Sequence, residues 1–134
     1  MRNVITPISF LLFCLSGFGQ TGVTDGSQKS VKDIAPLEVQ AMLGRATFHV
    51  IDVNEEDNFK EAHVPGAKRL DYDAITMDAL ASGKTDTLVF YCWSTECPAA
   101  DMAAETAVGL GFAKVFCMHA GITGWQDAGL PTEP

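Results

Sequence analysis

The sequence predicts an α/β protein with a mostly parallel central sheet and helices on both faces. The chain has 134 residues, which is enough for one compact domain. Apolar β-rich runs alternate along it with segments of helical periodicity. Strands separated by helices are joined by right-handed crossovers, and these build a parallel sheet whose two faces are covered.

Each expected element has its own local signal. Strands are expected where β-branched and aromatic residues run together, at 47–53, 86–92 and 114–118. Helices are expected where apolar residues recur every three or four positions, at 34–43, 73–81, 98–108 and 121–125. Asp33 is expected to cap the first helix, with Pro36 in its first turn and Gly44 at its end. Pro98 suits the first position of the third helix, and the acidic residues 54–57 suggest a solvated loop.

The charge excludes several classes of partner. Nine Lys and Arg residues against 17 Asp and Glu residues give a formal net charge of −8 and a pI near 4.6. An acidic chain repels phosphate backbones and anionic lipids, and no Lys/Arg cluster forms a local exception. We therefore expect no nucleic-acid partner.

The N-terminus has the layout of a secretory signal peptide. Arg2 supplies a positive charge, 4–15 is an apolar stretch, and Gly17 and Gly19 stand where a signal peptidase requires small residues. A membrane anchor is the alternative. The apolar stretch is shorter than the roughly 20 residues that span a bilayer, and Pro7 interrupts it, so we expect cleavage.

This interpretation divides the chain into a signal peptide over 1–19, a flexible polar lead-in over 20–32 and one domain over 33–134. After cleavage we expect no stable membrane insertion, and we expect the protein to be periplasmic or secreted. Such compartments are oxidising, so cysteines can form disulfides there.

The strand expected over 86–92 ends at Cys92, and the loop up to Cys97 connects it to the next helix. In parallel sheets the ligand crevice lies beyond the carboxyl ends of the strands. The helix that begins after the loop directs its unpaired N–H groups and positive dipole end toward this space, which favours a thiolate. Cys92 is therefore a candidate nucleophile, and a buried structural cysteine is the alternative.

Five segments in this order resemble a single-domain rhodanese, a sulfurtransferase of the rhodanese-like superfamily, over about 33–131. They are Val50-Ile-Asp-Val53, Glu61-Ala-His-Val-Pro-Gly-Ala67, Leu88-Val-Phe-Tyr-Cys92 with its loop, Leu110-Gly-Phe112, and Ala120-Gly-Ile-Thr-Gly-Trp125 with Gly129-Leu-Pro131. In the second segment Ala62 replaces a glycine of the family pattern. The resemblance implies a rhodanese-like fold.

The resemblance also implies a chemistry. Cys92 would be the catalytic residue and would carry a sulfane sulfur as a persulfide, with no metal and no organic cofactor. Backbone amides of the active-site loop would stabilise the charge on the outer sulfur. These amides belong to Trp93, Ser94, Thr95, Glu96 and Cys97.

The loop departs from the family pattern in its charge. Many members have Arg where this chain has Cys97, and Glu96 is acidic. A carboxylate near a thiolate raises the thiol pKa and repels anionic donors, which disfavours thiosulfate. An Arg often found after the first strand is Asn54 here, and Pro98 occupies the Arg position of phosphatases built on this fold. Phosphate-ester chemistry is therefore disfavoured.

Cys97 suggests a second step. As a resolving thiol it would attack the Cys92 persulfide, release sulfide and leave a disulfide that a periplasmic reductant reopens. A role as a small residue at the start of the helix is the alternative.

Cys117, Met118 and His119 are soft or borderline metal ligands at the end of the last expected strand. Alternation sends Cys117 and His119 to one face of the sheet and Met118 to the other, so the three cannot converge. We expect a core cysteine, an edge histidine and no metal site.

The sequence thus predicts an exported sulfurtransferase that moves a sulfane sulfur through Cys92. The donor would be thiosulfate, 3-mercaptopyruvate or polysulfide, and the acceptor a thiol or another nucleophile. A non-catalytic rhodanese-like binding module and a periplasmic dithiol redox protein that uses Cys92 and Cys97 remain alternatives.

Overall fold

A computed structural model describes residues 30–80 and 82–134. The strands are β1 (Lys32–Asp33), β2 (Phe48–Asp52), β3 (Lys68–Arg69), β4 (Thr87–Tyr91) and β5 (Lys114–Cys117). The helices are α1 (Pro36–Met42), α2 (Glu56–Glu61), α3 (Met77–Leu80), α4 (Ala99–Gly109) and α5 (Gly121–Asp127). The expected signal peptide and most of the expected lead-in lie outside the described residues. Within the described part, no helix is long and apolar enough to cross a membrane.

The sheet has five strands in the order β1-β5-β4-β2-β3, and every pairing is parallel. The central strand β4 pairs with β2 on one side and with β5 on the other. Leu88, Val89, Phe90 and Tyr91 are fully buried, because both faces of a parallel sheet are covered. The predicted parallel α/β fold is confirmed.

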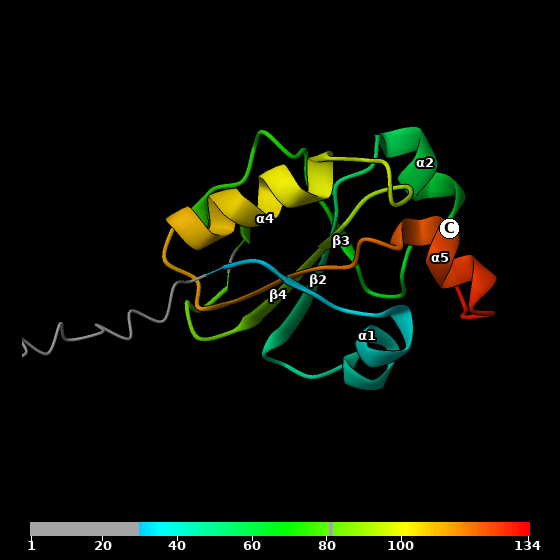
Figure 1. Ribbon diagram of the computed structural model, residues 1–134, viewed down its shortest axis with the longest axis horizontal. Helices are drawn as coiled ribbons and strands as arrows, with labels where there is room; N and C mark the ends of the chain where they lie inside the picture. The colour runs from blue at the N-terminus through cyan, green and yellow to red at the C-terminus, as the bar shows by residue number, and fades with distance from the viewer. Residues whose placement is uncertain (1–29, 81) are drawn as a thin grey trace, which may run out of the picture.

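Two apolar layers cover the sheet, with α4 on one face and α1 and α5 on the other (Figure 1). Alternation along β4 supplies both layers, since Phe90 packs beneath α4 while Val89 packs beside Trp125 of α5. Alanines line the buried side of α4, among them Ala103 and Ala107, and their small size lets the helix lie close to the strands.

The prediction that Asp33 caps the first helix is wrong. Ala35 holds the N-cap position of α1, and its N–H donates to a Glu38 carboxylate oxygen at 2.9 Å. Asp33 lies instead in β1, where it pairs with Cys117 of β5. The lead-in also ends earlier than expected, because Lys32 already belongs to this strand. Parallel pairing with β5 is a long-range contact that no local pattern could indicate.

The acidic loop expected after β2 contains a helix, α2, whose residues include none that is buried. Phe59 is its one apolar residue, so no apolar periodicity indicated the helix, and an ion pair between Lys60 and Glu56 spans one of its turns. The expected helix over 73–81 is shorter, since α3 covers only Met77–Leu80. Pro98 is the N-cap of α4, one position before the predicted one.

Candidate active site

Cys92 stands directly after β4, at the carboxyl edge of the sheet. Cys92 is 6% exposed, and it forms a disulfide with Cys97 at the other end of the loop. The two Cα atoms are 6.2 Å apart. The predicted nucleophile and the predicted resolving thiol are therefore brought together, and in this form neither sulfur is a thiol.

A hollow of about 280 Å³ opens beside this pair. Its lining comes from the segment after β2, helix α2, the loop after β3, the loop after β4 and the start of α4. The lining residues are Val53, Asn54, Glu55, Asn58, Tyr72, Cys92, Trp93, Cys97 and Ala99. Trp93 is 41% exposed and forms part of the wall. The sheet thus places its crevice beyond the carboxyl ends of the strands, where the fold class predicts a ligand.

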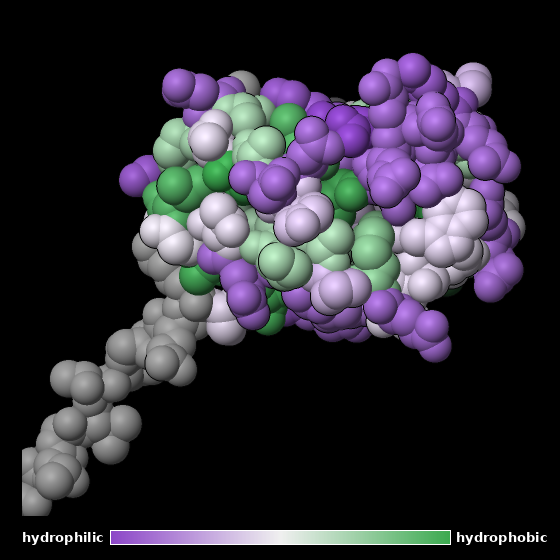
Figure 2. Space-filling model, turned by 90° about the horizontal axis from the view of Figure 1, so that it is seen from above, coloured by the Kyte–Doolittle hydropathy of each residue, from purple (hydrophilic) through white to green (hydrophobic). Residues whose placement is uncertain are grey.

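The electrostatics of the hollow are not those of an anion site. Among the described residues that line it, none is Lys or Arg, and Glu55 is a carboxylate. The nearby Arg69 guanidinium is already held by Asp71 and by the carbonyl oxygen of Asn54 at 3.1 Å. Hydrophilic side chains gather over the end of the molecule that carries α2 (Figure 2). The described lining thus offers no cationic side chain to attract a doubly charged donor.

The loop amides divide into two groups. Cys97 N–H donates to the Ser94 carbonyl at 3.2 Å, and Glu96 N–H donates to Ser94 Oγ at 3.4 Å. Within the described part of the chain, the amides of Trp93, Ser94 and Thr95 have no hydrogen-bond acceptor. In this conformation of the described loop, the amides of the second group are the ones that no internal hydrogen bond uses.

The start of α5 anchors the loop from the other side. Ile122 N–H donates to Cys92 O at 3.0 Å, and Thr123 N–H donates to Trp93 O at 3.1 Å. Gly121 makes this approach feasible, because a Cβ there would lie 2.5 Å from Trp93 O and the residue has φ +65°. Sequence reasoning missed this role, although the Gly-Ile-Thr-Gly segment was a signal for it.

A buried polar network supports the neighbouring strand. The Tyr91 hydroxyl donates to Asp52 Oδ2 and accepts a hydrogen bond from Val64 N–H at 3.0 Å. Asn54 N–H donates to Asp52 Oδ1 at 2.7 Å. Burial raises the pKa of Asp52, although these hydrogen bonds oppose the rise. The network fixes the turn after β2 and hence one wall of the hollow.

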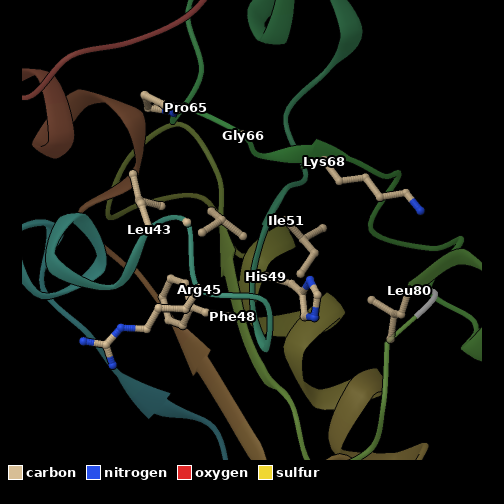
Figure 3. A pocket seen from close by; sticks show the side chains of 11 residues that line it. Leu43, Arg45, Phe48, His49, Ile51, Pro65, Gly66, Lys68 and Leu80 are labelled. Atoms are coloured by element: carbon tan, nitrogen blue, oxygen red, sulfur yellow. The ribbon is translucent and has the colours of Figure 1, made fainter.

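A second hollow, of about 270 Å³, lies along β2 and beside Lys68 of β3 (Figure 3). Its two lining cations, Arg45 and Lys68, point to opposite sides (Figure 3). Its histidine, His49, is paired with Asp86 at 2.9 Å. It holds no cysteine, and its polar groups do not converge, so the chemistry of this molecule is better sought at Cys92.

The rhodanese-like domain family model matches residues 35–128 of this chain. The chain therefore belongs to the rhodanese-like domain family, a superfamily that includes sulfurtransferases. The fold expected from the resemblance is confirmed. No curated protein sequence was found to match the chain.

Solved structures support the same assignment. The BH2092 protein of Bacillus halodurans is 26% identical, with a TM-score of 0.67 and coverage of 76% of each chain. A thiosulfate sulfurtransferase of Pseudomonas aeruginosa is 28% identical with a TM-score of 0.67, over 79% of this chain and 20% of that one. A rhodanese-related protein of Thermoplasma volcanium, 16% identical with a TM-score of 0.63, shares the fold over 76% of this chain and 97% of its own.

Proposed function

We propose that the protein is an exported sulfurtransferase that carries a sulfane sulfur as a persulfide on Cys92. One observation carries the proposal: Cys92 lies at the carboxyl end of the central strand, against a hollow and within bonding distance of a second thiol. Family membership supports the reaction class, and the N-terminal pattern supports export.

The disulfide must be opened before any transfer. A thiol reductant is oxidised to its own disulfide, and Cys92 and Cys97 become thiols. The Cys92 thiolate then attacks the outer sulfur of a donor R–S–SH. The S–S bond of the donor breaks, RS⁻ leaves and takes up the proton, and Cys92–S–S⁻ remains beside the unpaired loop amides.

The persulfide can react in two ways. An acceptor thiolate can attack its outer sulfur, which forms a new persulfide on the acceptor and restores the Cys92 thiolate. Alternatively, the Cys97 thiol passes its proton to the outer sulfur and attacks the inner sulfur, which reforms the Cys92–Cys97 bond, breaks the persulfide S–S bond and releases HS⁻. The Cys92–Cys97 disulfide supports the second reaction, because the two sulfurs reach each other without rearrangement of the fold.

The same bond favours a second candidate function, that of a dithiol oxidoreductase. In that case Cys92 and Cys97 exchange two electrons with a partner thiol pair and no sulfur atom is carried. The partner in either case is a small thiol or a periplasmic reductant.

The lining of the hollow narrows the choice of donor. Because Glu55 is a carboxylate and the lining has no Lys or Arg, we expect thiosulfate to be the slowest of the donors tested. Donors with a lower charge density, such as organic persulfides, suit this surface better.

The test uses the reduced protein with one donor at a time, namely thiosulfate, 3-mercaptopyruvate or polysulfide. Intact mass records sulfur uptake, and addition of cyanide converts a persulfide sulfur to thiocyanate. Uptake of one sulfur that Cys92→Ser abolishes and Cys97→Ser retains supports the sulfurtransferase. With Cys97→Ser, we also expect the persulfide to persist and sulfide release to stop.

Other outcomes contradict the proposal. A reversible loss of two hydrogens without sulfur uptake from any donor assigns the oxidoreductase function. Absence of both reactions, together with unchanged folding, assigns a non-catalytic binding module. Sulfide release that continues in Cys97→Ser would overturn the resolving role alone.

A further inference from the structure

A cluster of ligand-type side chains lies where β5 ends, outside the Cys92 hollow. Cys117 Sγ, a carboxylate oxygen of Asp101 and a ring nitrogen of His119 all lie within 4.8 Å of one another. Alternation along the strand turns only Met118 away from this cluster, since Cys117 and His119 share a face. Asp101 comes from the first turn of α4, so the third ligand type is supplied by the tertiary structure.

We propose that Asp101, Cys117 and His119 form a binding site for a divalent transition metal of the zinc class. Thiolate, imidazole and carboxylate are the donor types that Zn²⁺ prefers. In a tetrahedral zinc site, neighbouring ligand atoms lie about 3.5 Å apart. To bind an ion, His119 Nε2 and Asp101 Oδ1, now 2.9 Å apart, would have to move apart slightly, and the most distant pair of ligand atoms, no more than 4.8 Å apart, would have to come closer.

The hydrogen bonds of His119 already have the arrangement of a metal-bound histidine. Nε2 lies 2.9 Å from Asp101 Oδ1, and Nδ1 lies 2.6 Å from Asp33 Oδ1 on the opposite side of the ring. A metal bound between Nε2, Asp101 and Cys117 would leave Nδ1–H donating to Asp33. Metal-binding histidines commonly donate their other ring N–H to such a carboxylate, which fixes the tautomer and the orientation of the ring.

The cluster has an entrance for an ion. A hollow of about 470 Å³ is lined by Ser30, Val31, Asp101, Glu105, Val108 and His119. It shares no lining residue with the hollow beside Cys92. Cys117 is fully buried and His119 is hydrogen-bonded to Asp101, so an incoming ion must first separate that hydrogen bond. Water from the hollow that Glu105 lines could supply a fourth ligand.

The charge balance is favourable to a cation. Asp33 and Asp101 flank a single imidazole, and Glu105 lies one helical turn beyond Asp101. On binding, the thiol proton of Cys117 and any proton on His119 Nε2 pass to solvent, so binding releases protons. This step needs no oxidant or reductant, and it leaves the Cys92–Cys97 bond untouched.

The test uses the full chain with Cys14→Ser and with the Cys92–Cys97 disulfide formed, so that Cys117 is the remaining thiol. We expect Co²⁺ to bind at one equivalent, with a thiolate-to-cobalt charge-transfer band and the visible spectrum of a tetrahedral ion. Zn²⁺ is expected to displace it and to raise the Tm. Calorimetry then gives the Zn²⁺ affinity of each variant.

His119→Gln is expected to weaken Zn²⁺ binding at least tenfold, and Asp33→Asn about tenfold through loss of ring orientation. His49→Gln is the matched control, because His49 also pairs with an aspartate but has no thiol beside it, and it should bind Zn²⁺ as the parent does. Far-UV circular dichroism verifies folding. Co²⁺ binding without a charge-transfer band, binding that His119→Gln leaves unchanged, or no saturable binding would overturn the proposal.

Discussion

Cys92 and Cys117 stand at the carboxyl ends of neighbouring strands, yet their surroundings differ. Cys117 pairs in register with Phe90, two residues before Cys92, so the two thiols follow the same edge of the sheet. Cys92 opens onto a hollow and bonds to a loop cysteine. Cys117 is fully buried beside Asp101.

The comparison indicates that the end of a strand fixes where a cysteine lies, whereas the segment that follows the strand determines how exposed its sulfur is. After β4 the chain continues into a loop whose carbonyls are held by α5, so the sulfur stays at the surface of the crevice. After β5 the chain turns directly into α5, and α4 covers the sulfur. The sulfur of a cysteine at a strand end therefore faces a crevice in one place and is enclosed in the core in the other.

The largest expected effect is in thiol alkylation. Burial, followed by the nearby Asp101, raises the pKa of Cys117 to about 12 from an ordinary value of 9.0. Only the thiolate reacts, so we expect the reduced protein to alkylate at Cys92 and Cys97 at least about 1,000-fold faster than at Cys117. Mass spectrometry of iodoacetamide-treated protein measures the three rates. Similar rates at all three positions would remove the contrast between the two strand ends.

The next effect concerns the anchor of the loop. In Gly121→Ala the new Cβ would lie 2.5 Å from Trp93 O at a residue with φ +65°, so we expect a loss of about 2–4 kcal/mol in unfolding free energy. Sulfur transfer should fall at least tenfold, because the loop that holds Cys92 must shift.

Gly129→Ala is the matched control for this change. Gly129 also has a positive φ, +71°, but a Cβ there meets nothing within 4 Å. We expect a cost of about 1 kcal/mol from backbone strain alone and unchanged sulfur transfer. Urea unfolding and the thiocyanate assay check both variants. Equal losses in the two variants would show that the contact with Trp93 does not matter.

A smaller effect concerns charge beside the reactive thiol. Glu96→Gln removes a carboxylate from the loop, so we expect kcat/KM with thiosulfate to rise about two- to fivefold, as an interaction of up to about 1 kcal/mol allows. Glu61→Gln, at the end of α2, is the control and should change it little. A rise of the same size in both variants would indicate a general charge effect.

The smallest expected effect is in the pH dependence of the unfolding free energy. It arises from a histidine–aspartate pair that has no cysteine beside it. The hydrogen bond from His49 lowers the pKa of Asp86 from its ordinary 3.8. A lowered pKa in the folded state gives stability that is present above pH 3.8 and is lost as the pH falls through the folded value. In Asp86→Asn we therefore expect a shallower fall of the unfolding free energy below this pH. An unchanged slope in urea titrations would contradict the assigned partner.

The elements that the sequence predicted best are those with strong local patterns. The strands around Val50, Val89 and Val115 were predicted to within a residue or two, because continuous apolar runs are typical of buried parallel strands. The candidate nucleophile followed from the same pattern, since Cys92 ends the central run. The prediction failed where no local apolar pattern marks the element, as in β1, which pairs with β5 over a long range, and in α2, which has no buried residue.

The sequence by itself determined the parallel α/β fold, the position of Cys92 at a strand end and the acidity of its loop, because these depend on periodicity and on neighbours along the chain. Only the tertiary structure decided which groups converge. It brought Gly121 of α5 against Trp93, and Asp101 of α4 beside Cys117 and His119. The physical reason is that convergence depends on how α4 and α5 pack against the sheet, and packing joins residues that share no local pattern.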